Sequence, residues 1–486
     1  MSSRILRFAR LALIVLAIFM GLTITLRTLF GPFHFWLISV TVPLNPEGFF
    51  GLAITVVLAL AGAKPSSKSR WTHHQAAWLA LAVAAVTIFA LRRALGIYFL
   101  SDDFIVVKYA NEWTAASLQY IVTHGGGDGF FRPVGYIVLA LNAKWAGLDP
   151  IGWHAGALAI HAANSALVML LARRLGASVL AAAFAGMLFG LHGTRPEAAV
   201  WIVGRFDLLA AFFVLSGFLL FTMLSNHESA RYPIHAAALA CFALASLSKE
   251  AAFIFPLFVA GYVLWKRQPL SWTIPYFVLA AMLFAYRWSL FGGIGGYIVP
   301  ATGRPAAFSL GFGSTLKAVA VRLWTSFYFP INWSRDPGLH FALLAIAYMG
   351  AMLWLAMRSR PAQPLWPIVA AILIACIPPL SLLSGSPTLT GSRVLYLPSV
   401  WFAILLALAV DGLSGRARSV VATVALLFQF VALQHNLDFW EQASAQVKAA
   451  CTSGSADLPA FIQGVPALAN GRQECPEIGR ATAGPP

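Results

Sequence analysis

Apolar runs of about twenty residues recur along nearly the whole chain, separated by short loops that carry Lys and Arg. A run of this length can cross the hydrocarbon core of a bilayer as one helix. Hydrophobic residues make up 59% of the chain and charged residues only 10%, which excludes an ordinary soluble globular protein. The sequence predicts an all-α polytopic membrane protein with roughly thirteen spans, at residues 11–30, 47–63, 76–100, 152–172, 178–193, 200–224, 234–248, 251–265, 272–290, 338–357, 366–385, 397–412 and 418–435.

Alternate loops are basic, which predicts the orientation of the chain. The clusters are Arg4, Arg7 and Arg10; Lys64, Lys68 and Arg70; Arg173 and Arg174; Arg231; Lys266 and Arg267; Arg358 and Arg360; and Arg416 and Arg418. By the positive-inside rule this side, with the N-terminus, is cytoplasmic. We expect a bacterial inner (plasma) membrane. The net charge of +16 then reflects membrane topology, and nucleic-acid binding is not expected.

The longer segments face outward in this topology: 101–151, 291–339, 386–395 and the tail 436–486. Apolar residues recur at helical spacing from Asp103 to Leu118, which predicts an amphipathic helix on the membrane surface. The tail is expected to be a small irregular appendage. Its two cysteines, Cys451 and Cys475, can form a disulfide if the tail is exported.

Two adjacent aspartates, Asp102 and Asp103, directly follow the apolar run Ala77–Leu100. Two like charges side by side at a membrane surface are costly without partners. The alternative is a solvated loop start. Because the pair lies where a helix leaves the membrane, we interpret it as the catalytic candidate.

Further ionisable residues gather at outward corners. They are Arg132 after the Gly125–Gly127 hinge; His192, Glu197, Arg205 and Asp207; Lys249 and Glu250; and Arg393 and Tyr396. Charged groups inside or beside a span are expensive unless paired or functional. Lys249 and Glu250 are chain neighbours and cannot face each other on a helix, so each is expected to have a different partner. The alternatives are an ion pair of Arg205 with Asp207 or Glu197, and anchoring of the others at headgroup level.

Four stretches together resemble the GT-C membrane glycosyltransferases, closest to the TMTC-type protein O-mannosyltransferase group. They begin with FFRPVGYIVLALNAKWAGLDPIGWHAGALAIHAANSALVMLLARRL and HGTRPEAAVWIVGRFDLLAAFF, and continue with LSKEAAF and SRVLYLPSV, in the order of the family. The resemblance covers roughly residues 76–435 as a catalytic core, after two extra N-terminal spans in 1–75.

The resemblance implies transfer of a sugar from a polyprenyl-phosphate carrier to an acceptor hydroxyl on the non-cytoplasmic face. It places a catalytic acid where Asp102 and Asp103 lie. Asp102 is the expected general base, with Asp103 orienting or binding the acceptor; the reverse order is the alternative. The leaving phosphate needs electrostatic support, for which the candidates are Arg132, Arg205, Lys249 and Arg393. Supporting roles fall to His192, Glu197, Asp207, Glu250 and Tyr396.

The chain departs from the family pattern in several places. It has no tetratricopeptide signature after residue 435, Ser392 stands where the family has Glu, and Arg195 adds a charge to the His192–Glu197 stretch. The acceptor stays open between a glycan, a lipid and a protein. No metal site is predicted, although paired carboxylates can hold Mg²⁺ or Mn²⁺. The competing functions are an O-antigen ligase or polymerase type of transferase and a lipid or glycan flippase.

Overall fold

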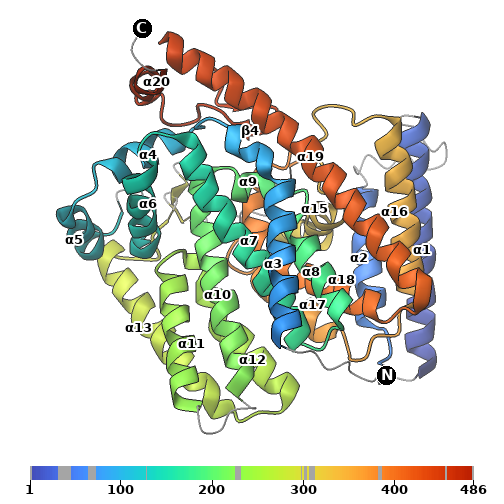
Figure 1. Ribbon diagram of the computed structural model, residues 1–486. Coiled ribbons are helices and arrows are strands. Elements are labelled where there is room, and N and C mark those ends of the chain that lie inside the picture. Colours follow the sequence, from blue (N-terminus) through green and yellow to red (C-terminus); the bar gives the residue numbers. More distant parts are fainter. Residues whose placement is uncertain are drawn as a thin grey trace.

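The computed structural model describes residues 3–30, 45–63, 73–126, 129–224, 231–296, 298–299, 304–305, 312–380, 386–454 and 457–483. Within these ranges the chain forms a bundle of helices with two very short hairpins (Figure 1). The predicted basic loop with Lys64, Lys68 and Arg70 lies outside the described residues, as does Gly127 of the predicted hinge.

The described part of the chain contains seven helical segments long and apolar enough to cross a membrane: Ile5–Leu26, Pro150–Arg174, Ile202–Met223, Leu270–Phe291, Leu339–Arg358, Ser392–Asp411 and Gly415–Ser453. They correspond to α1 (Ser3–Phe30), α7 (Pro150–Arg174), α10 (Arg205–Met223), α13 (Ile274–Phe291), α16 (Leu339–Arg358), α18 (Tyr396–Asp411) and α19 (Gly415–Ser453). The chain is therefore a polytopic helical membrane protein, as predicted.

The other predicted spans are also helical. They are α2 (Pro46–Ala59), α3 (His73–Ala90), α8 (Val179–Gly190), α11 (Arg231–Ser246), α12 (Phe255–Lys266) and α17 (Trp366–Ala375). The short 3-10 helices η1 (Arg92–Gly96), η2 (Ile202–Gly204), η4 (Glu250–Ile254), η5 (Leu270–Thr273) and η9 (Ser392–Leu395) lie at the ends of these spans.

The core of the bundle surrounds α18, whose residues 396–410 are all buried. Helices α7, α8, α10 and α17 pack around it. The outer helices instead expose large apolar side chains, such as Phe8 on α1, Trp78 on α3 and Met282 on α13. In water such exposure would be costly, and it suits a surface that faces lipid.

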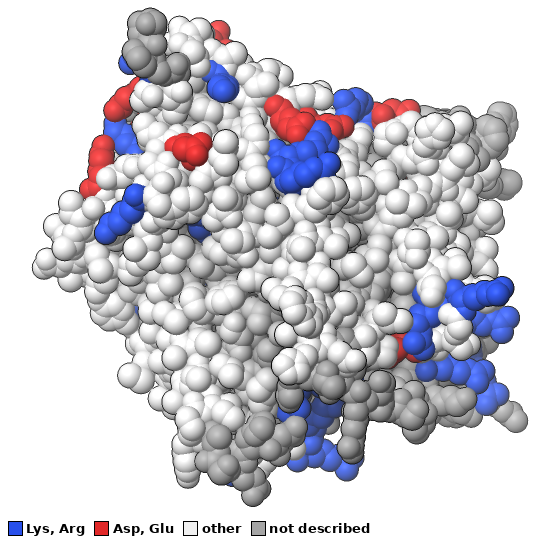
Figure 2. Space-filling model, in the orientation of Figure 1, with Lys and Arg blue, Asp and Glu red and all other residues white. Residues whose placement is uncertain are grey.

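Charged residues gather toward two ends of the molecule and leave a broad uncharged belt between them (Figure 2). At the end near the N-terminus the visible charges are almost all positive. Contacts join the predicted cytoplasmic loops at this end: the Arg10 side chain donates to the Ala356 carbonyl at 3.2 Å, and Ser178 donates to Asp411 at 2.5 Å. The two termini lie at opposite ends of the bundle (Figure 1).

The segments that the sequence predicts to face outward form smaller elements. They are α4 (Asp103–Asn111), α5 (Ala115–His124), α6 (Pro133–Ala146), α9 (Arg195–Ala199), β1 (Ile298–Val299), β2 (Arg304–Pro305), α14 (Phe312–Lys317), the π-helical turn η7 (Ala318–Arg322) and α15 (Leu323–Tyr328). The prediction of one amphipathic helix over 103–118 is wrong, because the chain breaks after Glu112 and Thr114 caps a new helix by accepting the Ser117 N–H.

The last span is longer than predicted. Helix α19 has 39 residues, or about 58 Å at 1.5 Å per residue, which is about twice the thickness of the hydrocarbon core. Its second half therefore continues beyond the predicted end at 435. The tail adds β3 (Phe461–Ile462), β4 (Val465–Pro466) and α20 (Cys475–Ala483). The predicted Cys451–Cys475 disulfide is present.

Candidate active site

The two adjacent aspartates differ sharply in their surroundings. Asp103 is buried, and its carboxylate accepts the Leu100 N–H at 3.1 Å and the Val203 N–H at 3.3 Å. Burial raises the pKa of Asp103 well above its usual value, although the Leu100 N–H lowers it in part. Asp102 is half-buried and accepts a hydrogen bond from the Asn470 amide. Asp103 thus fixes the corner, and Asp102 is the more exposed member of the pair.

The backbone before the pair is unusual. Ser101 has a φ of 49°, in the left-handed region that favours glycine. Such a conformation costs about 1–3 kcal/mol in a residue with a side chain, and it persists only where neighbouring contacts enforce it. Ser101 is buried, and its N–H donates to the Ala467 carbonyl at 2.7 Å. The conformation of the acid corner is therefore imposed by tertiary contacts.

Trp201 connects the acid corner with the outward cations. Its indole N–H donates to the Leu100 carbonyl at 3.2 Å, directly before Ser101 and the acid pair. The guanidinium carbon of Arg393 lies 4.2 Å from the centre of the Trp201 ring, a distance typical of a cation–π contact. The segment that leads into the acid pair and Arg393, which are far apart in the sequence, therefore contact the same tryptophan.

Two ion pairs lie close to Arg393. The Lys249 ammonium is 2.6 Å from the Asp207 carboxylate, and Arg132 forms a two-pronged pair with Glu250, with N···O distances of 3.0 and 2.5 Å. The expectation that Lys249 and Glu250 have different partners is confirmed. The Val134 N–H donates to the Leu247 carbonyl at 3.1 Å, which joins the start of α6 to the turn that carries Lys249.

Electrostatics in this group are strongly coupled. Burial lowers the pKa of Lys249, the Asp207 carboxylate raises it, and the nearby Arg132 and Arg393 charges lower it. Burial alone would raise the pKa of Glu250, but the charge and hydrogen bonds of Arg132 lower it to about 2. We call Arg132, Asp207, Lys249, Glu250 and Arg393 the cation cluster. It contains three cations and two carboxylates, and the Glu197 carboxylate adds a third acid beside the Arg393 backbone.

Glu197 shapes the backbone around Arg393. Its carboxylate accepts the Gly391 N–H and the Arg393 N–H, both at 3.0 Å, and the Ser392 hydroxyl at 3.1 Å. These groups begin the 3-10 helix η9, so Glu197 satisfies its free N–H donors. Ser392, which replaces the glutamate of the family pattern, is thereby bound by a glutamate from another segment. Glu197 therefore stabilises the backbone that carries Arg393.

The Arg393 guanidinium carries an unused donor. Its Nη1 is buried and has no hydrogen-bond partner within the described ranges. A buried donor without a partner costs about 1–3 kcal/mol. A guanidinium donor without a partner in the described part of the chain, close to a second cation, Lys249, is suited to an anionic ligand.

Three other predicted residues serve the interior of the bundle. Arg205 is buried, and its two terminal nitrogens donate to the Asn142 side chain and the Trp153 carbonyl. The alternative of an ion pair between Arg205 and Asp207 or Glu197 is therefore wrong. The Tyr396 hydroxyl lies 2.7 Å from His161 Nδ1 and 3.0 Å from Asn164 Nδ2.

The third of these residues, His192, is held by Thr194 and by the Phe327 carbonyl at 2.9 and 3.0 Å. Like Arg205 and Tyr396, it is buried among helix-packing contacts.

Among the described residues, no group of three or more His, Cys, Asp or Glu side chains is arranged to hold a metal ion. Both Asp103 oxygens accept backbone N–H groups, so the acid pair does not fit a Mg²⁺ or Mn²⁺ site.

Comparison with known proteins places these residues in context. No model of a known protein family matches the chain. The chain is 34% identical over 94 residues to the protein O-mannosyl-transferase Tmtc1 of Drosophila melanogaster, 39% over 90 residues to Tmtc2 of the same species, and 30% over 146 residues to human TMTC3. The resemblance to the TMTC-type proteins is confirmed. The matched stretches cover 19%, 18% and 28% of this chain, but only 11%, 10% and 16% of these relatives.

Two solved structures are similar over most of the chain. The crystal structure of ArnT from Cupriavidus metallidurans bound to undecaprenyl phosphate matches over 83% of this chain and 88% of ArnT, with a TM-score of 0.45 and 15% identity. The apo structure of the same protein matches with a TM-score of 0.37 and 16% identity.

Sequence reasoning missed two residues near the site. Arg322 ends the π-helical turn η7 and lines a pocket with Ser326, Thr390 and Ser392. Its place in the outward 291–339 loop is a signal that a search for cations outside the spans would have found. Asn470, which binds Asp102, carries no comparable signal, because an amide in a polar tail resembles any surface residue.

Proposed function

We propose that this protein is an inverting membrane glycosyltransferase that moves a sugar from a polyprenyl-phosphate carrier to an acceptor hydroxyl on the non-cytoplasmic face. Asp102 accepts the proton of the hydroxyl as its oxygen attacks the anomeric carbon. The bond from that carbon to the carrier phosphate breaks, and the phosphate leaves as an anion. Only one catalytic carboxylate is needed, because a phosphate leaves without being protonated.

The observation that carries this proposal is the unused buried donor of Arg393, whose guanidinium also contacts the tryptophan that binds the acid corner. Preorganised cations stabilise the charge that develops on a leaving phosphate. Lys249 and Arg132 add positive charge near Arg393. Arg205 acts instead by holding α6 and α7 in place through Asn142 and Trp153.

A flippase is the competing function from another class. A transporter is expected to carry ionisable residues or broken helices near mid-membrane. Here Asp102, Lys249 and Arg393 lie at helix ends on one side of the bundle, which favours chemistry at the interface. An O-antigen ligase type of transferase also uses outward cations, and the identity of the acceptor separates it from the leading proposal.

The decisive experiment measures sugar transfer from labelled polyprenyl-phosphate sugar by purified protein, with mannose first because the similar proteins are named mannosyl-transferases. Asp102→Asn is expected to reduce turnover by roughly 100-fold or more while donor affinity is retained. Glu112→Gln, an exposed carboxylate on the same outward segment, is the matched control. Near-normal turnover in both Asp102→Asn and Asp103→Asn would exclude a general base at this corner.

Donor binding tests the cation cluster separately. Arg393→Met is expected to weaken the affinity for polyprenyl phosphate, since its unused donor would lose the phosphate. Arg335→Met removes an exposed cation paired with Asp438 and serves as the control. Equal donor affinity in wild type and Arg393→Met would remove Arg393 from the donor site.

The proposed face of the membrane has its own test. A single cysteine at Gly126, in a background lacking the free Cys241 and Cys376, should react in intact cells with a thiol reagent that cannot cross the membrane. Protection of that cysteine, together with labelling of one placed at Arg360, would reverse the proposed orientation.

A further inference from the structure

The C-terminal tail is built into the outward face of the molecule. The Ala467 carbonyl accepts the Ser101 N–H at 2.7 Å, the Gln463 carbonyl accepts the Asn332 side chain at 2.9 Å, and the Gly464 carbonyl accepts the Thr390 hydroxyl at 2.9 Å. One short segment therefore bonds to three loops that are distant in the sequence. Two of these loops carry the acid pair and the start of η9.

The densest of these contacts surround the acid corner. The Asn470 N–H donates to the Ser101 hydroxyl at 3.2 Å, and the Asn470 side-chain amide donates to Asp102 Oδ1. Gly471 follows with a φ of 74°, and a side chain there would lie 2.5 Å from the Ser101 carbonyl oxygen. The tail thus passes too close to the strained Ser101 for any larger residue at this position.

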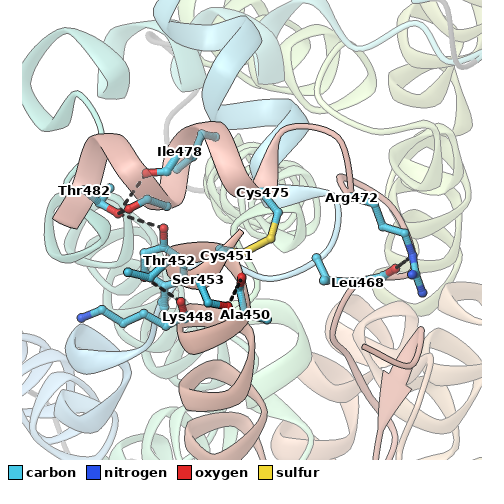
Figure 3. Close-up of a disulfide and its surroundings, with 12 residues drawn as sticks. Lys448, Ala450, Cys451, Thr452, Ser453, Leu468, Arg472, Cys475, Ile478 and Thr482 are labelled. Atoms are coloured by element: carbon cyan, nitrogen blue, oxygen red, sulfur yellow. Dashed lines mark hydrogen bonds between the residues drawn. A yellow bond between two sulfur atoms is a disulfide. The ribbon is translucent and has the colours of Figure 1, made fainter. Parts of the chain in front are cut away.

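A disulfide fastens the tail at its far end. Cys475, at the start of α20, is bonded to Cys451 near the end of α19 (Figure 3). Gly479 on α20 packs directly on the Cys451 backbone, where a side chain would lie 2.6 Å from the carbonyl carbon. The Thr482 hydroxyl lies 3.0 Å from the Tyr98 hydroxyl, just before the acid corner. The segment that bears Asn470 is therefore held at both ends.

We propose that the tail is a positioning element of the active site, with Asn470 as its positioning residue and the Cys451–Cys475 disulfide as its fastener. Asn470 occupies one oxygen of Asp102 and so directs the other oxygen toward the acceptor hydroxyl. The inference rests on the proposed function, because it assigns Asp102 the role of base. It also makes full activity depend on the oxidised disulfide, which forms in an exported compartment.

The physical reason is that a mobile catalytic carboxylate lowers the rate of the reaction. A base that is misplaced by about 1 Å can lose roughly 100-fold in rate. Ser101 holds its left-handed conformation only while the tail bonds to it, and the disulfide keeps the tail from exchanging those bonds for water. Reduction would leave the fold of the membrane core intact, since the core of the bundle lies around α18.

The test separates catalysis from binding. Asn470→Ala is expected to lower kcat by roughly 10- to 100-fold with little change in donor KM. Glu477→Gln, which removes an exposed ion pair between the tail and Lys108, is the matched control and should keep full turnover. Wild-type kcat in Asn470→Ala would overturn the proposal for this residue.

Reduction of the folded wild-type protein provides the second arm. A trialkylphosphine gives two electrons to the disulfide, becomes the phosphine oxide with an oxygen from water, and leaves two thiols. We expect kcat to fall while donor affinity stays unchanged, and the Cys451→Ser/Cys475→Ser protein should match the reduced enzyme and no longer respond to phosphine. Unchanged kcat after complete reduction would overturn the proposed role of the disulfide as the fastener of the tail. If Asp102→Asn also keeps full turnover, Asp102 is not the base and the premise of this inference fails, whereas a wild-type protein that transfers no sugar would refute the proposed function itself.

Discussion

The buried pair of Lys249 and Asp207 allows structural and catalytic roles to be separated. The two charged atoms are 2.6 Å apart, and the side chains are only 14% and 9% exposed. Lys249→Met keeps a similar stem but removes the charge, so Asp207 is left buried without its partner. Breaking a buried pair in this way costs about 3–5 kcal/mol in the free energy of unfolding.

A second substitution removes the orphaned charge. In Lys249→Met/Asp207→Asn both members are neutral, and the free energy of unfolding should return to within about 1 kcal/mol of wild type, because buried pairs contribute little net stability. Turnover should not return. If Lys249 supports the leaving phosphate, both variants should lose roughly 100-fold or more in kcat.

The measurements are unfolding in detergent followed by circular dichroism, and sugar transfer under saturating acceptor. Lys108→Met, which breaks the exposed pair with Glu477, is the control and should change neither quantity. Wild-type stability in Lys249→Met would contradict the burial argument. Recovery of full turnover in the double variant would show that Lys249 only supports the fold.

Three further outcomes follow from the site. Arg132 holds the pKa of Glu250 at about 2 instead of 4.5. The ionised Glu250 therefore stabilises the folded protein above pH 4.5, and this stabilisation is lost as the pH falls toward 2. The free energy of unfolding should accordingly fall more steeply with acid in wild type than in Glu250→Gln. Glu197→Gln weakens the acceptor of the Arg393 backbone N–H and should lower the affinity for the sugar donor about tenfold, measured by binding titration. It should also lower the free energy of unfolding by roughly 1–3 kcal/mol, measured by unfolding. Arg205→Met should lower the yield of folded protein, measured by size-exclusion chromatography, while the folded fraction keeps most of its affinity for the sugar donor. A normal yield with weakened donor affinity would return Arg205 to the phosphate site.

Helix positions followed from the sequence because the bilayer imposes a length and an apolar composition that a single chain must satisfy locally. The basic loops could likewise be grouped from their Lys and Arg residues. The partners of Lys249 and Glu250 could be expected to differ, since chain neighbours point apart. Each of these conclusions depends only on nearby residues.

What the sequence alone could not decide was which charged residues meet. Arg205 and Arg393 look alike as interfacial arginines, yet packing bonds both terminal nitrogens of Arg205 to Asn142 and Trp153 and leaves a terminal nitrogen of Arg393 without a partner among the described residues. The sequence predicted a small irregular appendage for the tail, and only the folded chain brings Asn470 to Asp102. Such choices depend on residues hundreds of positions apart, whose distances are set by helix packing and not by any local pattern.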